Sequence, residues 1–530
     1  MIVRSPFPDV NIPEISLTTL VLQRAVELKD KPAMIDGPSG RTLTFGQLAG
    51  AVKLAAAGLA HKGLHKGDVF AIYSPNLPEY FIAFHAVASL GGINTTVNPL
   101  YTVHELTNQL KDSNAKYLLT IPHFIGPALE AAKAANIREV FVFGEAEGAT
   151  SFATLLQNNG QLPPDYPPVQ INPKEDLIVL PYSSGTTGLA KGVMLTHYNL
   201  VANIMQSMGV TEEAISLRED DVCMGLLPFF HIYGMVVILN WALCKGATVV
   251  TMPRFDLEQF LQLFEKYGIT YANLVPPIIL ALAKHPLVDK YDLSKLRQIT
   301  SGAAPLSAEV ARACAQRLNC TVNQGYGLTE TSPVTHYGAD PAKDKLGSVG
   351  PCLPNTESKV VDVASGQTLA MGEHGEICIR GPQVMKGYLN NPQATANMID
   401  PEGWLHTGDI GYFDEDNYFY VVDRLKELIK YKGLQVAPAE LEAVLLTHPA
   451  IADAAVIASP DEEAGEVPKA FVVLKGEVSA DAILAFVAER VASYKKIRRL
   501  EIVQQIPKSA SGKILRRVLV DQERAKVAAG

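Results

Sequence analysis

Cysteine is scarce in this chain, and its spacing excludes two kinds of small stabilised fold. The 530 residues contain six cysteines, and none of them forms a Cys-x-x-Cys pair. Disulfide scaffolds and zinc ribbons both depend on closely spaced cysteines. We therefore expect reduced thiols in a reducing compartment, and neither a disulfide framework nor a zinc ribbon.

An excess of positive charge is also missing. The chain has 46 Lys and Arg residues against 55 Asp and Glu residues, a formal net charge of −9. Such a surface repels a phosphate backbone as a whole, so we expect no general nucleic-acid binding. Hydrophobic residues make up 48% and charged residues 19%, a balance that supports large buried cores. At about 150 residues per domain, the length predicts roughly three to four folding units.

Long apolar runs are rare, and one of them needs interpretation. Residues 222–244 contain no Asp, Glu, Lys or Arg over a length sufficient to cross a bilayer. Pro228, His231 and Asn240 lie inside the run, and lipid would leave such groups without partners. We interpret the run as a buried helix with its entry loop and expect no membrane span. The chain shows no signal peptide, prenylation box or peroxisomal tail, so we expect a cytoplasmic protein.

Helical and strand patterns alternate through the first two thirds of the chain. Thr44 and Gln47 form a capping box ahead of apolar residues at helical spacing. Short apolar runs predict buried strands at 69–73, 117–120, 140–143 and 177–182, and a helical pattern covers 80–90. This alternation predicts an α/β fold of largely parallel sheets covered by helices.

The pattern changes twice further along. After about Gly338, glycine, proline and β-branched residues predict a β-rich, more antiparallel unit. Beyond Arg424, two helical patterns, from Pro438 and from Ser479 to about Val491, accompany two apolar strands, which predicts a small α+β domain. The predicted domains are 1–423, with a β-rich subdomain at about 338–423, and 424–530, with a hinge near 424–426.

The strongest local motif is YSSGTTGLAKGV, residues 182–193, directly after a predicted strand. Its glycines free the backbone to turn closely, and its hydroxyl groups and lysine suit a phosphate group. It is not a Walker A loop, because Ala190 and Gly192 stand where that motif needs glycine and a hydroxyl residue. A mobile Ser/Gly/Thr turn is the alternative interpretation.

The segment QGYGLTE, residues 324–330, also carries groups suited to a nucleotide. Tyr326 can lie against a flat purine, Thr329 can meet a phosphate, and Glu330 can hold a magnesium ion. An ordinary core tyrosine and a solvated carboxylate are the alternatives.

Residues 406–436 offer groups for a sugar. Asp409 can accept from both ribose hydroxyls, and Arg424 can brace it. The charged run at 424–432 is either a solvated helix face or, since it falls at the predicted domain boundary, a hinge.

Two isolated residues are further candidates for the functional site. Lys513 lies in a Ser/Gly turn ahead of a basic helix, where a flexible ammonium could enter a cleft, although many C-terminal lysines only aid solubility. His231 lies in the apolar segment 226–234 and could equally be a satisfied core histidine. The chain has no HExxH, GxSxG or Cys/His nucleophile signature.

Together these motifs resemble the adenylate-forming enzymes, the superfamily of acyl-CoA synthetases, luciferase and peptide-synthetase adenylation domains. The resemblance covers about residues 17–517. Within it, the similarity is greatest to 4-coumarate:CoA ligases and their bacterial cinnamate-activating relatives, in the segments FFHIYG, SGAAPL, QGYGLTE and 421–443. It implies a large N-terminal domain of parallel, helix-covered sheets with a β-rich subdomain, and a small mobile C-terminal domain. It also implies that a carboxylic acid and MgATP give acyl-AMP and pyrophosphate, after which the CoA thiol displaces AMP.

The resemblance also implies roles for individual residues. The β- and γ-phosphates would be held by Ser183, Ser184, Gly185, Thr186, Thr187 and Lys191. Adenine and the α-phosphate would be held by Ala303, Gln324, Gly325, Tyr326 and Thr329, the ribose by Asp409 and Arg424, and magnesium by Glu330. The acid pocket would be lined by Tyr233, Val237, Gly302, Gly327, Pro333 and Val334.

The remaining implied roles belong to the chemistry and to CoA. Lys513 would stabilise the adenylation transition state, and His231 would orient the carboxylate and gate the thiol. Lys430 and Gln435 would act at the nucleotide and carboxylate in one half-reaction, and Lys426, grouped with the nucleotide-binding residues, would lie at the hinge. CoA would be contacted by Arg254, Lys432 and Gly433.

The residues implied for the acid pocket are compatible with more than one acid. Tyr233 could bond a para-hydroxyl, but Gly234, Met235 and the bulky Val237 depart from the plant pattern. Coumarate, cinnamate and a medium-chain fatty acid all stay open. A nucleotide-binding protein without catalysis is the third hypothesis, against which Lys513 and Glu330 argue. The expected partners are the acid, ATP and CoA, acting on a monomer or homodimer.

Overall fold

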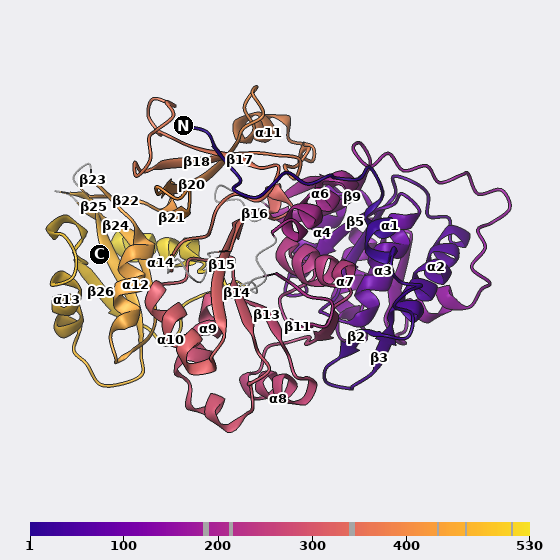
Figure 1. The fold of residues 1–530 in the computed structure, drawn as a ribbon, viewed down its shortest axis with the longest axis horizontal. Coiled ribbons are helices and arrows are strands. Elements are labelled where there is room, and N and C mark those ends of the chain that lie inside the picture. The colour runs from indigo at the N-terminus through magenta and orange to yellow at the C-terminus, as the bar shows by residue number, and fades with distance from the viewer. Residues whose placement is uncertain are drawn as a thin grey trace.

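The structure is a computed structural model that describes residues 1–183, 190–210, 216–338, 345–431, 434–461, 464–509 and 512–529, with the backbone only at 434–435 and 527–529. Two eight-stranded sheets form most of the molecule (Figure 1). The first has the order β19 (Gly387–Tyr388), β10 (Lys191–Thr196), β9 (Leu177–Ser183), β5 (Ile93–Val97), β4 (Val69–Tyr73), β6 (Ala115–Thr120), β7 (Glu139–Val142) and β8 (Thr150–Ser151). The second has the order β16 (Val334–Tyr337), β15 (Thr321–Gly327), β14 (Gln298–Ser301), β13 (Tyr271–Leu274), β11 (Val222–Gly225), β12 (Thr248–Thr251), β2 (Pro32–Asp36) and β3 (Thr42–Thr44).

Helices cover these sheets and join their strands. They are α1 (Leu17–Leu22), α2 (Phe45–His61), α3 (Pro78–Ser89), α4 (Val103–Asp112), α5 (Ile125–Ala134), α6 (His197–Met208), α7 (Ala242–Lys245), α8 (Leu257–Tyr267), α9 (Pro276–Lys284) and α10 (Ala308–Leu318). The central pairings are parallel, as in β4 with β5 and β13 with β14. One continuous buried core contains residues from both sheets, such as Phe70 and Val249. The predicted α/β class is therefore confirmed.

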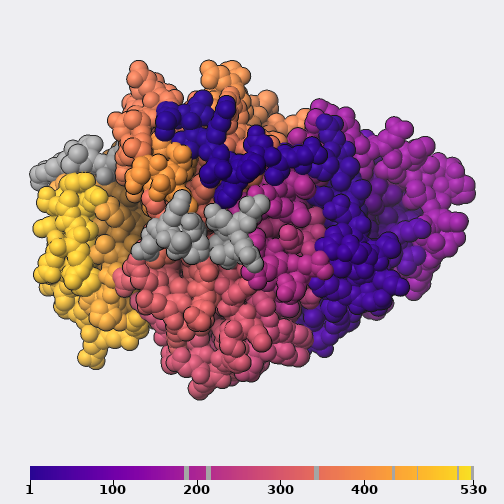
Figure 2. Space-filling view, viewed as in Figure 1, coloured from indigo at the N-terminus to yellow at the C-terminus, as the bar shows by residue number. Residues whose placement is uncertain are grey.

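A β-rich unit and a small α+β unit complete the chain. The β-rich sheet has the order β1 (Val3–Arg4), β17 (Glu357–Val361), β18 (Gly375–Arg380), β20 (Leu405–Phe413) and β21 (Phe419–Arg424), with α11 (Pro392–Met398) beside it. The C-terminal unit contains β22 (Ile429–Tyr431), β23 (Leu434–Val436), α12 (Pro438–Thr447), β24 (Ile451–Asp461), β25 (Gly465–Leu474), α13 (Ala480–Ala488), β26 (Arg499–Ile502) and α14 (Arg516–Ala529). It has its own buried core, around Ile429, Leu441 and Val472. The N-terminal segment lies across the surface of the β-rich unit (Figure 2).

Many element positions agree with the sequence patterns. The capping box of Thr44 and Gln47 begins α2, and the predicted strand at 69–73 is β4. The helix from Ser479 was predicted to run to about Val491 but ends at Ala488. The described part of the run, 424–431, is not a helix face, because β21 ends at Arg424 and β22 follows from Ile429.

The apolar run at 222–244 is only partly the helix that we predicted. Its first four residues form β11, inside the second sheet, and its later part is a π-helix, Tyr233–Trp241, continued by α7. A short apolar run has no periodicity that distinguishes a buried strand from a buried helix, which explains the error. Among the described residues, no helix is long and apolar enough to cross a membrane.

Buried polar contacts hold the π-helix in register. Asn240 donates from Nδ2 to the carbonyl of Met235 at 2.9 Å, and its Oδ1 lies 2.9 Å from Nε2 of His85. Nδ1 of His85 lies 2.9 Å from the Thr18 hydroxyl. Burial lowers the pKa of His85 to about 3, so the ring stays neutral in the folded protein.

We expect His85 to contribute to acid sensitivity. Its pKa is lower in the folded chain than the value of about 6.5 in the unfolded chain, so the unfolded chain takes up the proton first as the pH falls. The stability contribution is present above pH of about 6.5 and lost below it. Between pH 7 and 5 the free energy of unfolding should fall about 2 kcal/mol further in the parent than in His85→Gln, measured by urea titration. Equal pH dependence in both proteins would contradict this assignment.

Candidate active site

One cavity opens where the parallel strands β11, β13, β14 and β15 end. Parallel sheets commonly bind ligands at the carboxyl ends of their strands, where side chains from several strands meet. The lining residues are Ser207, His231, Ile232, Tyr233, Val237, Trp241, Asn273, Thr300, Gly302, Ala303, Gly325, Tyr326, Gly327, Leu328, Thr329, Pro333, Val334, Tyr337 and Lys513. All six residues predicted for the acid pocket are among them, so segments distant in the sequence converge here.

Two glycines shape one wall of the cavity. A Cβ on Gly302 would lie 2.6 Å from Cε1 of Tyr233, and a Cβ on Gly327 would lie 1.9 Å from the carbonyl oxygen of Pro333. Side chains at these positions would therefore fill the space in front of Tyr233 or break the adjacent backbone. Next to Gly302, Ala303 has a φ of +71°, an uncommon conformation for a residue other than glycine.

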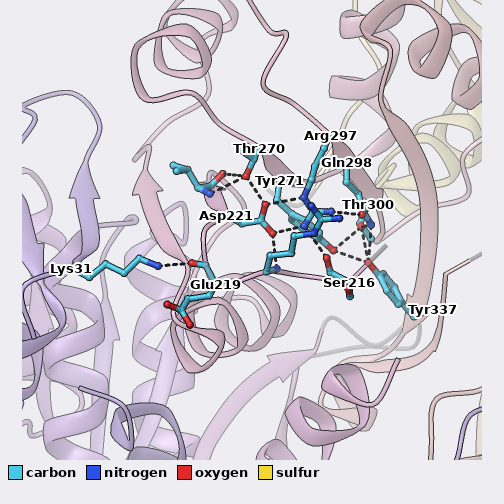
Figure 3. A network of polar contacts seen from close by, with 12 residues as sticks. Lys31, Ser216, Glu219, Asp221, Thr270, Tyr271, Arg297, Gln298, Thr300 and Tyr337 are labelled. Carbon is cyan, nitrogen blue, oxygen red and sulfur yellow. Dashed lines mark hydrogen bonds and ion pairs between the residues drawn. The ribbon is translucent and has the colours of Figure 1, made fainter. Parts of the chain in front are cut away.

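A buried polar network underlies the cavity (Figure 3). Arg297 forms an ion pair with Asp221 and donates from Nη2 to the carbonyl of Ser216 at 2.8 Å. Its guanidinium carbon lies 5.4 Å from the ring centroid of Tyr271, whose hydroxyl lies 2.7 Å from the hydroxyl of Tyr337. Because Tyr337 lines the cavity, this chain of contacts fixes the floor of the pocket.

Tyr233 is also fixed by its hydroxyl group. That hydroxyl donates to the carbonyl of Thr300 at 3.2 Å and lies 3.4 Å from Oδ1 of Asn273. Both partners come from neighbouring parallel strands, β14 and β13. The ring therefore stands as a rigid wall of the cavity.

Lys513 reaches this cavity from the C-terminal unit. Gly512 precedes it with a φ of +77°, and a Cβ there would lie 3.0 Å from Val275 at the start of α9. Burial lowers the pKa of Lys513, and the nearby Arg424 lowers it further, whereas the carboxylates of Asp409 and Glu330 oppose that shift. The ammonium group thus lies among charges of both signs.

His231 is the second basic group of the cavity. Burial, together with the charge of Lys513, lowers its pKa to about 3. Its Nδ1 accepts from the backbone N–H of Tyr233 at 3.3 Å. A neutral ring with an acceptor at Nδ1 carries its proton on Nε2, so His231 can donate a hydrogen bond.

Asp409 and Tyr326 form the buried contact that we expected to face a nucleoside. The Tyr326 hydroxyl donates to Oδ2 of Asp409 at 2.6 Å, and Nε of Arg424 lies 3.5 Å from Oδ1. In the antiparallel pair β20 and β21, Asp409 lies directly opposite Arg424. Burial raises the pKa of Asp409, and the charge of Arg424 offsets part of that rise.

Glu330 has partners from two other segments. Its Oε1 accepts from the Ser183 hydroxyl at 3.0 Å and from the Tyr388 hydroxyl at 2.7 Å. Nζ of Lys191 lies 4.5 Å from the centroid of the Tyr388 ring. The two described ends of the predicted phosphate loop therefore converge on Glu330.

Several predicted residues lie apart from the cavity or outside the described chain. Lys430, Lys426 and Arg254 are exposed and do not line the cavity, and Gln324 is buried with its Oε1 on the backbone N–H of Leu306 at 2.9 Å. Residues outside the described chain are Ser184, Gly185, Thr186, Thr187, Lys432 and Gly433, together with the side chain of Gln435.

Sequence reasoning missed several residues of the site. Asn273, Thr300 and Tyr337 line the cavity, and Tyr388 supports Glu330. They come from separate strands and share no local motif. Trp241 was also missed, although it lies eight residues after the predicted pocket residue Tyr233 in the same apolar run.

Two family models match the chain, one over most of the large N-terminal part and one within the C-terminal unit. The family described as "AMP-binding enzyme" matches residues 21–389, and "AMP-binding enzyme C-terminal domain" matches residues 440–513. The chain therefore belongs to the AMP-binding enzyme family.

The chain is also similar to individual named proteins and solved structures. The chain is 45% identical to 4-coumarate–CoA ligase 1 of Solanum tuberosum over 100% of this chain and 97% of that protein. It is 44% identical to 4-coumarate:CoA ligase 1 of Petunia hybrida over the same shares. Among solved structures, it is similar to the anthranilate CoA ligase AuaEII in complex with anthranoyl-AMP, with a TM-score of 0.88, 26% identity and coverage of 98% of this chain and 99% of that one. ATP-bound MatB from Rhodopseudomonas palustris gives a TM-score of 0.85, 27% identity and coverage of 96% and 99%.

We expect Asp409→Asn to weaken nucleotide binding. The amide keeps one acceptor oxygen but loses the negative charge that pairs with Arg424. The Kd for ATP should rise roughly tenfold or more, measured by titration calorimetry. Asp416→Asn, which changes an exposed carboxylate paired with Lys345, is the matched control. An unchanged Kd in Asp409→Asn would place the ribose elsewhere.

Proposed function

We propose that the protein is an ATP-dependent acid:CoA ligase that joins an aryl carboxylic acid, of the 4-coumarate or cinnamate type, to CoA through an acyl-AMP intermediate. The observation that carries this proposal is the position of Lys513. A buried ammonium from the C-terminal unit enters a cavity that also holds His231 and borders the Asp409 contact. The names of the 4-coumarate:CoA ligases to which the chain is similar support the aryl class.

In the first step, a carboxylate oxygen of the acid attacks the α-phosphorus of ATP, and pyrophosphate leaves. Negative charge grows on the oxygens around phosphorus, and the Lys513 ammonium stabilises it in an environment with little water. The neutral His231, with its proton on Nε2, donates to the carboxylate and holds it in line. Asp409 and Arg424 hold the ribose, while Tyr326, Thr329, Ala303, Gly325 and Gln324 surround adenine and the α-phosphate.

In the second step, the CoA thiolate attacks the acyl carbon, and AMP leaves as the thioester forms. A carboxylate is a poor acyl donor, and adenylation supplies the leaving group. Lys513 has no role in this step, so the C-terminal unit pivots near residues 424–426, with Lys426 at the hinge, and withdraws it. We assign Lys430 and Gln435 to the nucleotide and the carboxylate in one of the two half-reactions, and Arg254, Lys432 and Gly433 to contacts with CoA.

The residues around Glu330 fit a magnesium ion bound together with ATP. Mg²⁺ is usually held by one or two carboxylates and by substrate phosphates, and Glu330 is a buried carboxylate beside the described ends of the phosphate loop. When bound, the ion would neutralise phosphate charge. Ser183 and Lys191, with Ser184, Gly185, Thr186 and Thr187 between them, are assigned to the β- and γ-phosphates.

The proposal extends to the cellular compartment and to the number of chains. Within the described residues the six cysteines are free thiols, which supports a reducing compartment, and we propose the cytoplasm. All groups assigned to the reaction come from one chain, so a monomer suffices and a homodimer is compatible.

Pyrophosphate exchange with Lys513→Ala tests the mechanism. The parent should exchange pyrophosphate into ATP only when a carboxylic acid is added. The rate of that exchange should be at least about a hundredfold lower in the variant, since it lacks the group that stabilises the transition state. It should still convert preformed acyl-adenylate to thioester with CoA. Lys508→Ala, which removes a lysine of the same segment paired with Asp453, should exchange normally. Exchange without added acid would refute the proposed function.

Gly302→Ala tests the position of the aromatic acid. The new methyl group would press on Tyr233 and narrow the pocket. The KM for cinnamate or coumarate should rise roughly tenfold while the KM for ATP changes little, because overpacking costs about 1 to 3 kcal/mol. Gly50→Ala on α2, where a Cβ meets open space, is the control. An octanoate kcat/KM more than tenfold above those of the aryl acids in the parent would favour a medium-chain fatty acyl-CoA synthetase instead.

A further inference from the structure

Trp241 ends the π-helix that runs along the cavity. Tyr233 begins this helix, and His231 lies in the loop just before it, close enough to Lys513 for the lysine charge to lower its pKa. Trp241 lies eight residues beyond Tyr233 and packs edge to face with Tyr337, with a centroid distance of 6.3 Å. The π-helix therefore leads from the reacting end of the cavity to Trp241.

The indole N–H of Trp241 has no hydrogen-bond partner among the residues that the structure describes. Seven described side chains have a buried nitrogen or oxygen atom without a hydrogen bond: Tyr80, Asn94, Gln109, His197, Trp241, Ser301 and Asn323. Trp241 is the one among these seven that lines the cavity, and the residue is 4% exposed. Leaving a buried donor unpaired is costly, and native structures rarely do so without reason.

The neighbouring polar groups already have partners. The Tyr233 hydroxyl donates to the carbonyl of Thr300, and the hydroxyl of Thr300 donates to Oδ1 of Asn323 at 2.9 Å. The Tyr337 hydroxyl lies 2.7 Å from that of Tyr271 and accepts from Gln298 at 3.1 Å. The hydrogen bonds of the network in Figure 3 thus pair the polar groups at the floor of the cavity, and none of those described above involves Trp241.

We propose that Trp241 is a specificity-determining residue whose indole N–H donates a hydrogen bond to an oxygen atom at the end of the acid remote from its carboxylate. An indole nitrogen can only donate, so the group it recognises must be an acceptor: a hydroxyl, ether or carbonyl oxygen. A plain hydrocarbon end leaves the donor unpaired and is selected against. This inference rests on the proposed acid:CoA ligase function and concerns the choice of acid within it.

The test compares acids of equal size that differ in one oxygen. In 4-methoxycinnamate an ether oxygen replaces the CH₂ group of 4-ethylcinnamate, and in 7-oxooctanoate a carbonyl replaces a methylene of octanoate. We measure kcat/KM for both pairs by acid-dependent pyrophosphate exchange. The proposal is judged on the pair of acids that the parent turns over faster. The parent should prefer the oxygen-containing acid about tenfold, and Trp241→Phe should reduce that ratio to about one.

Val237→Ala is the matched control, because it enlarges the same cavity from the same helix and leaves the indole in place. It should keep the preference for oxygen even if its rates change. Since the ratio is taken within one protein, partial loss of folded Trp241→Phe does not alter it. A parent ratio near one, or an equal ratio in Trp241→Phe, would overturn the proposal for Trp241. Absence of exchange with any acid would instead refute the ligase function.

Discussion

The site depends on placing one ammonium group, that of Lys513, inside a cavity built by another part of the chain. Taking a charge out of water is expensive unless opposite charges compensate it. Here Asp409 and Glu330 compensate, whereas Arg424 repels the ammonium, and the net effect with burial is a lowered pKa. The phosphates of a bound nucleotide would supply the missing negative charge. The same imbalance favours the withdrawal of Lys513 that we propose for the second step.

The turn that carries Lys513 is anchored by a second buried group of charges. Arg516, at the start of α14, forms ion pairs with Glu442 on α12 at 2.7 Å and with Glu427 at 2.8 Å. Burial raises the pKa of Glu442 to about 7, and the charge of Arg516 opposes that rise. Glu427 lies between β21 and β22, next to the hinge predicted near 424–426. The position of the ammonium is therefore coupled, through Arg516, to the segment about which the C-terminal unit is proposed to pivot.

The sequence predicted those features whose evidence is local. Strands such as β4 follow from short apolar runs, and Asp409 and Lys513 stand out because their neighbours form recognisable motifs. Residues whose role arises from convergence could not be found in this way. Asn273, Thr300 and Tyr337 belong to three strands and meet only when the second sheet forms. The π-helix was also hidden, since an unbroken apolar run has the same composition whether it forms a strand, an α-helix or a π-helix.

The residues assigned to the reaction lie on different parts of the fold from the residues that shape the acid pocket. The groups assigned to chemistry, Lys513 and His231, lie in a turn and in a loop, where small backbone changes can move them. Most of the groups that shape the pocket lie on strands and on the π-helix, near the contacts of Asn240 and the Arg297 network, and Gly302 directly follows β14. Substitutions along the π-helix can therefore change which acid fits without changing how the acid is activated. The hydroxyls of Tyr233 and Tyr337 are already paired within the pocket, which is why we propose that the bound acid supplies the acceptor for the indole N–H of Trp241.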